Sequence, residues 1–76
     1  MTQKTTVIGR YEIELDTDMN GDGEVTGCWV SSGDYSASLQ ALEATGELDD
    51  LRGEDSLIVK PADITKIVSW AKANGY

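Results

Sequence analysis

An acidic, glycine-containing loop stands between two segments of alternating residues, and it constrains the fold more than any other feature of the chain. The loop runs from Asp16 to Thr26 and contains the Asn-Gly and Asp-Gly pairs that suit turns with positive φ. Apolar and polar residues alternate with period two over residues 11–15 before it, and residues 25–30 after it are also strand-like. The pattern predicts a β-hairpin with an acidic tip.

Oxygen-bearing side chains in this loop are spaced as in a calcium loop. Counted from Asp18 as position 1, Asn20 stands at position 3, Asp22 at position 5 and Gly23 at the sharp-turn position 6. In this spacing the segment resembles the calcium loops of dockerin and EF-hand proteins, which implies a calcium site formed by Asp18, Asn20 and Asp22. Position 12 holds Trp29 in place of the bidentate carboxylate. Together with the flanking strands, this favours a hairpin turn with weak calcium affinity at most, and no other cofactor is expected.

The remaining pattern predicts a single acidic α+β domain over residues 1–76, with element order β-β-α-β-α. The expected strands cover roughly 5–15, 24–31 and 57–59, the first having Val7, Tyr11, Ile13 and Leu15 on one face. A right-handed crossover between the second and third strands would place the first strand between them. The prediction is a two-layer fold with a three-stranded antiparallel sheet of order 2-1-3 and helices on one face.

Two helices complete this prediction. The first is expected to cover about ten residues, with Ser32-Gly33-Asp34 as its N-cap and Gly46 as its end. A polar connection with at most one helical turn should follow over residues 47–55. The second helix is expected from Pro61 to Gly75, with Trp70 at the border of its core stripe.

Charge limits the partners of this chain. Fourteen acidic residues against six basic ones and no histidine give a formal net charge of −8, which argues against direct binding to nucleic acid or to an anionic membrane. No apolar run is long enough to cross a bilayer. The lone Cys28 cannot form an intramolecular disulfide and is expected to be a buried thiol. We therefore expect a soluble, cytoplasmic protein.

The acidic residues are concentrated in two clusters, over residues 12–24 and 43–55. Such clustering costs stability through self-repulsion, which interspersed lysines would relieve. Glu12 and Glu14 share one face of their strand, about 7 Å apart, the same order as the phosphate spacing along a nucleic acid strand. The candidate partner-binding residues are Glu12, Glu14, Asp16, Asp18, Asp22, Glu24, Glu47, Asp49 and Asp50.

Catalysis finds little support in this composition. Without histidine there is no Ser-His or Cys-His pair and no base naturally poised near neutral pH. Paired carboxylates could act as in glycosidases, but a chain of 76 residues is too short to enclose the deep cleft that such chemistry needs. We expect a protein that is not an enzyme.

Three interpretations of function remain open. The first is an inhibitor that occupies the basic nucleic-acid-binding surface of another protein by charge mimicry. In size and charge the chain resembles small acidic inhibitors encoded by phages and mobile elements, among them DNA-mimicking anti-CRISPR proteins. The second is a calcium-binding or calcium-stabilised hairpin module that uses the loop from Asp18 to Thr26. The third is an accessory domain whose acidity serves solubility alone.

Overall fold

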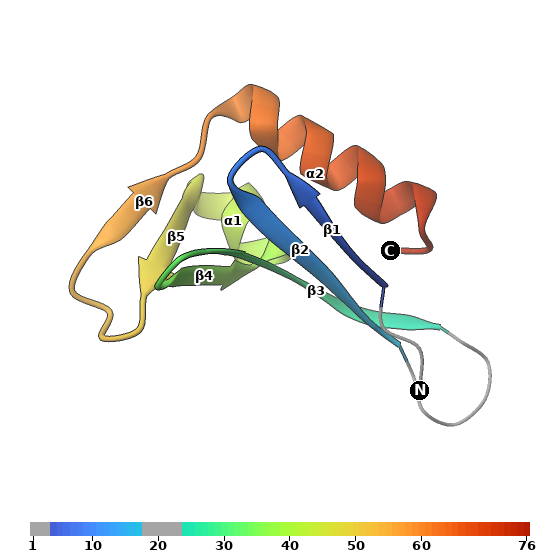
Figure 1. Ribbon diagram of the computed structural model, residues 1–76, viewed down its shortest axis with the longest axis horizontal. Coiled ribbons are helices and arrows are strands. Elements are labelled where there is room, and N and C mark those ends of the chain that lie inside the picture. The colour runs from blue at the N-terminus through green and yellow to red at the C-terminus, as the bar shows by residue number, and fades with distance from the viewer. Residues whose placement is uncertain (1–3, 18–23) are drawn as a thin grey trace.

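Six antiparallel strands form one sheet in which spatial order follows chain order. The computed structural model (Figure 1) describes residues 4–17 and 24–76. Its sheet has the order β1-β2-β3-β4-β5-β6, with α1 inserted between β4 and β5 and α2 following β6. The elements are β1 (Lys4–Ile8), β2 (Tyr11–Thr17), β3 (Val25–Ser32), β4 (Tyr35–Ser38), α1 (Leu39–Thr45), β5 (Glu47–Asp50), β6 (Ser56–Ile58) and α2 (Pro61–Ala73).

The predicted three-stranded sheet of order 2-1-3 is therefore wrong, and so is the β-β-α-β-α element order. Two tight turns, together with an additional strand in the predicted polar connection, account for the difference. Gly9 and Arg10 connect the paired residues Ile8 and Tyr11, so the predicted first strand is in fact the hairpin of β1 and β2. Gly9 has φ 61°, and glycine at the first central position suits the two-residue turns that match strand twist.

The second tight turn shortens the first helix. Gly33, with φ 61°, and Asp34 join β3 to β4, whereas the sequence pattern predicted a helix N-cap here. The true N-cap is Ser38, whose Oγ accepts a hydrogen bond of 3.2 Å from the Ala41 N–H. Because β4 and β5 then pair antiparallel, no parallel crossover forms.

The hairpin also moves Val7 to the other face. In one continuous strand Val7 would share a face with Tyr11 and Ile13, but its partner across the turn is Glu12. Directly paired residues point to the same side of an antiparallel sheet. Val7 is accordingly 66% exposed, while Tyr11, Ile13 and Leu15 are buried.

Residues 47–55, predicted as a polar connection, instead contribute β5 and the loop to β6. Other expectations are confirmed. β2 and β3 pair as a hairpin, β3 and β6 lie within one residue of the predicted second and third strands, and Gly46 ends α1. The helix α2 begins at Pro61 as predicted and ends at Ala73, two residues before Gly75.

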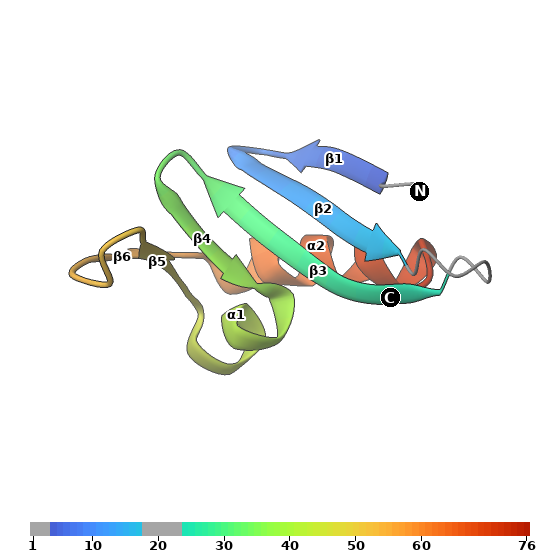
Figure 2. The ribbon, with the colours of Figure 1, turned by 90° about the horizontal axis from the view of Figure 1, so that it is seen from below.

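Both helices contribute to one core on one side of the sheet. Ile13, Leu15 and Val30 from the strands meet Leu39 of α1 and Ile67 of α2, and all five are fully buried. Figure 2, which views the molecule from below, shows strands β2 and β3 passing in front of α2. Neither of the two described helices covers the opposite side of these strands, which therefore offers a surface for binding.

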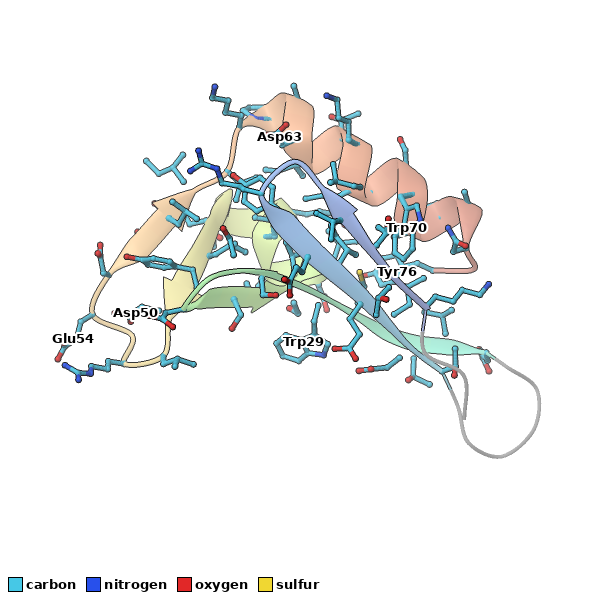
Figure 3. The ribbon with its side chains drawn as sticks, viewed as in Figure 1. Trp29, Asp50, Glu54, Asp63, Trp70 and Tyr76 are labelled. Atoms are coloured by element: carbon cyan, nitrogen blue, oxygen red, sulfur yellow. The ribbon has the colours of Figure 1, made fainter. Side chains whose placement is uncertain are left out.

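Trp70 lies on the sheet side of α2 (Figure 3) and is partly buried against the core, as predicted. Neither α1 nor α2, the helices of the described part of the chain, is long and apolar enough to cross a membrane.

Candidate functional site

The sheet face that points away from the helices is the candidate functional site, and we call it the open face. Side chains alternate along each strand, so the register assigns every second strand residue to this face. Its members are Thr5, Val7, Glu12, Glu14, Asp16, Gly27, Trp29, Ser31, Ser36, Ser38, Glu47, Asp49, Ser56 and Ile58.

Acidic side chains on this face are aligned by the sheet register. Glu12 is paired with Ser31, Ser31 with Ser36 and Ser36 with Asp49, so one row across four strands connects two of the predicted partner-binding carboxylates. The next row brings Glu14 directly opposite Trp29, which is paired in turn with Ser38. The register therefore places acids from both sequence clusters on one surface.

Asp16 extends the line of carboxylates on β2. Its cross-strand partner is Gly27, which has no side chain. The Asp16 carboxylate lies close to this glycine, because a Cβ atom added at Gly27 would lie 4.0 Å from Asp16 Oδ2. The Asp16 carbonyl accepts a hydrogen bond of 3.3 Å from Thr26 Oγ1, next to the shift in register that follows Asp16. Glu12, Glu14 and Asp16 thus follow one another at intervals of about 7 Å along one strand.

Basic side chains in the described part of the molecule lie away from the open face. None of the described strand positions on the open face carries a basic side chain, whereas five carry carboxylates. The basic residues of the chain lie in turns, on the helix side of β1 or along and beside α2: Lys4, Arg10, Arg52, Lys60, Lys66 and Lys72. The open face is therefore the acidic side of a polarised molecule.

The second acidic cluster is divided by the fold. Glu47 and Asp49 belong to the open face, but Asp50 lies on the other side of β5, opposite Tyr35. Asp50 Oδ1 accepts hydrogen bonds from the backbone N–H groups of Arg52 (3.1 Å) and Glu54 (2.8 Å). Its carboxylate therefore holds the β5–β6 loop in place. The sequence pattern placed Asp50 among the partner-binding residues and did not predict this structural role.

Asp55 has a similar local role. It accepts a hydrogen bond of 3.0 Å from the Tyr35 hydroxyl and one of 2.8 Å from the Ser56 N–H. The hydrogen bond to Asp55 and the carboxylate's charge raise the pKa of Tyr35 above its ordinary value. Of the other predicted site residues, Glu24 is exposed just before β3, and Asp18, Asn20 and Asp22 lie outside the described residues.

Trp29 is the main component of the surface that the sequence did not single out. It is 49% exposed, although its chain neighbours Cys28 and Val30 are buried. Figure 3 shows Trp29 projecting from the sheet on the side away from α2. The signal was present in the alternation along β3, but alternation alone does not say which side a helix covers.

A shallow pocket of about 380 Å³ lies beside Trp29. It is lined by Thr5, Thr6, Val7, Glu12, Ile13, Glu14, Trp29 and Ser31. The volume is near the lower end of the range for ligand pockets, roughly 300–1,000 Å³. An aromatic ring and two carboxylates on an open surface suit the binding of a cationic group.

Two further features of the described residues bear on possible chemistry: the Cys28 thiol and the arrangement of potential metal ligands. Cys28 is buried, as predicted, and burial together with the nearby charge of Asp16 raises the pKa of its thiol to about 11, which keeps it protonated at neutral pH. Within residues 4–17 and 24–76, no group of three or more histidine, cysteine or acidic residues is arranged to hold a metal ion.

Comparison of the chain with protein-family models, with curated proteins and with solved structures finds no match.

Proposed function

We propose that this chain binds a basic protein partner through its open face and inhibits that partner by occupying a surface that otherwise binds nucleic acid. The observation that carries the proposal is the line of Glu12, Glu14 and Asp16 along β2, on a face without described basic residues. Such one-sided charge steers a basic partner to this surface and orients it there.

Two features favour binding over a purely solubilising role. A solubilising surface intersperses both signs of charge, whereas the described strand positions of the open face carry five carboxylates and no basic side chain. The same face also exposes Trp29 and Val7, which a surface selected only for solubility would avoid. Interfaces place such an apolar centre inside a polar rim.

The spacing of the carboxylates supports the mimicry part of the proposal. Glu12, Glu14 and Asp16 follow one another along a single strand, with about 7 Å between successive residues. This distance is of the same order as the spacing of successive phosphates along a nucleic acid strand. A protein groove lined by lysine and arginine to follow a nucleic acid backbone would meet a similar row of negative charges. The proposed inhibitor thereby resembles the ligand that it displaces.

A pull-down with matched charge variants tests the proposal. The open-face variant combines Glu12→Gln, Glu14→Gln and Asp16→Asn. The control combines Asp34→Asn, Glu43→Gln and Glu54→Gln, which remove the same charge from exposed sites elsewhere. The wild-type chain and the control should capture the same basic nucleic-acid-binding protein, a short DNA or RNA duplex should release it, and the open-face variant should not retain it.

Salt and activity measurements complete this test. Capture should weaken as ionic strength rises, because exposed charges are screened over about 8 Å at physiological salt. The captured protein should lose nucleic acid binding in a mobility-shift assay when the wild-type chain is added. Equal capture by the open-face variant, with an unchanged circular dichroism spectrum, would contradict the proposal.

A further inference from the structure

We infer that the pocket beside Trp29 receives an arginine side chain of the partner, with the guanidinium stacked on the indole ring and paired with a carboxylate. This inference rests on the proposed function and specifies the chemistry that the open face recognises. Glu14 on β2 is paired directly with Trp29 on β3. Directly opposite residues have Cβ atoms about 5 Å apart, so a carboxylate and an aromatic ring are held side by side.

The pocket extends next to this pair. Glu12, two residues from Glu14, lies opposite Ser31, which stands two residues from Trp29 on β3. The serine side chain is short, so it leaves space beside the indole ring. Glu12, Glu14, Trp29 and Ser31 all line the pocket of about 380 Å³. A planar group that enters this space meets an aromatic ring and two carboxylates.

Strand β1 forms one edge of the pocket. Thr5 and Val7 on β1 pair with Glu14 and Glu12, respectively, and line the pocket on the side away from Trp29. Val7 is exposed, and its methyl groups offer an apolar contact for the methylene stem of a long cationic side chain. The pocket therefore presents apolar surface for a stem and charged and aromatic surface for a head group.

Arginine fits this arrangement better than lysine. The guanidinium is planar and delocalised, stacks on aromatic faces, and presents a fork of N–H donors that pairs with a carboxylate in a bidentate manner. The lysine ammonium is a compact, strongly hydrated point charge that gains less from the indole ring. An exposed cation–π contact contributes about 1 kcal/mol, which corresponds to about a fivefold difference in affinity.

Two peptides with the same charge isolate this effect. Octa-arginine and octa-lysine are titrated against the wild-type chain and against Trp29→Ala, Trp29→Phe, Glu14→Gln and the control Glu43→Gln. We expect octa-arginine to bind about fivefold more tightly than octa-lysine. Trp29→Ala should abolish the preference, Trp29→Phe should keep part of it, and Glu43→Gln should preserve it. Glu14→Gln should weaken arginine binding more than lysine binding.

The indole N–H resonances of the two tryptophans supply an independent readout. The resonance that is absent from Trp29→Phe should shift on addition of octa-arginine, while that of Trp70 stays in place. Equal affinity for both peptides in the wild-type chain, a preference that survives Trp29→Ala, or an unmoved Trp29 resonance would each overturn the inference.

The outcomes separate this inference from the proposed function. If both peptides bind equally and the triple open-face variant loses both, the arginine pocket is wrong and the acidic binding face stands. If the triple open-face variant binds both peptides as well as the matched control does, the open face does not recognise cations and both proposals fail.

Discussion

Glu14 on β2 and Trp29 on β3 are direct cross-strand partners on the face of the sheet that the helices leave uncovered. Trp70, the other tryptophan, packs against the core from α2. The two indoles therefore have different environments, and the same substitution at each should have different consequences.

Replacing each tryptophan by alanine should lower the free energy of unfolding by different amounts, because Trp70 packs against the core and Trp29 lies on the surface. Trp70→Ala should lower the free energy of unfolding by about 3 kcal/mol, because it removes a large side chain packed against the core. Trp29→Ala should cost less than about 1 kcal/mol, the scale of a cross-strand pair. Urea unfolding followed by circular dichroism measures both. A loss at Trp29 as large as that at Trp70 would mean that Trp29 supports the fold.

Asp50 should stabilise the β5–β6 loop through its acceptor oxygen. Asp50→Ala leaves the N–H groups of Arg52 and Glu54 without this partner, and we expect a loss of about 1 kcal/mol. Asp50→Asn keeps a side-chain carbonyl and should cost less. Urea unfolding measures the difference, with Asp49→Ala as the control on the adjacent open-face position. Equal effects of the alanine variants at positions 49 and 50 would contradict this role.

The turn between β3 and β4 should require glycine at its first position. Gly33 has φ 61°, and an added Cβ would meet no atom within 4 Å, so any penalty comes from backbone conformation alone. Gly33→Ala should destabilise the chain by about 1 kcal/mol, while Gly33→Asn should be tolerated better. Thermal unfolding of the two variants gives the comparison. A stable Gly33→Ala variant would indicate that the hairpin accommodates another turn type.

Cys28 should make stability depend on pH in the alkaline range. Its pKa rises from 9.0 to about 11 on folding, mainly because the thiol is buried. The unfolded chain loses this proton first as pH rises, so the stability present below pH 9.0 should fall between pH 9.0 and about 11. Cys28→Ala removes the titrating group. The difference in unfolding free energy between wild type and variant should therefore shrink across this window, and a constant difference would exclude the linkage.

Calcium binding by the loop between β2 and β3 should be weak at most. The loop is flanked by strands, and position 12 of the calcium pattern is Trp29 on β3. Millimolar calcium should raise the melting temperature only slightly, and Asp22→Ala should remove that rise. Asp34→Asn serves as an acidic control outside the loop. A stoichiometric isotherm at micromolar calcium would instead establish a specific site.

The sequence alone determined the features that depend on local chemistry. Alternation around the acidic loop predicted the β2–β3 hairpin, Pro61 predicted the start of α2, and Gly46 predicted the end of α1. The burial of Cys28 and the common face of Glu12 and Glu14 also followed from residue type and period. Each of these depends on residues close together in the chain.

Only the tertiary structure decided how the strands combine. The turns at Gly9 and Gly33 could each have been a bulge or a helix cap, because glycine permits all of these conformations. Their formation as hairpins, together with strand β5 in the predicted polar connection, changed the sheet from three strands to six. The turn at Gly9 put Val7 on the uncovered face, and the turn at Gly33 added β4 to the row that aligns Glu12 with Asp49 across four strands. Strand register joins residues far apart in sequence, so the composition of the open face depends on long-range pairing that local periodicity does not encode.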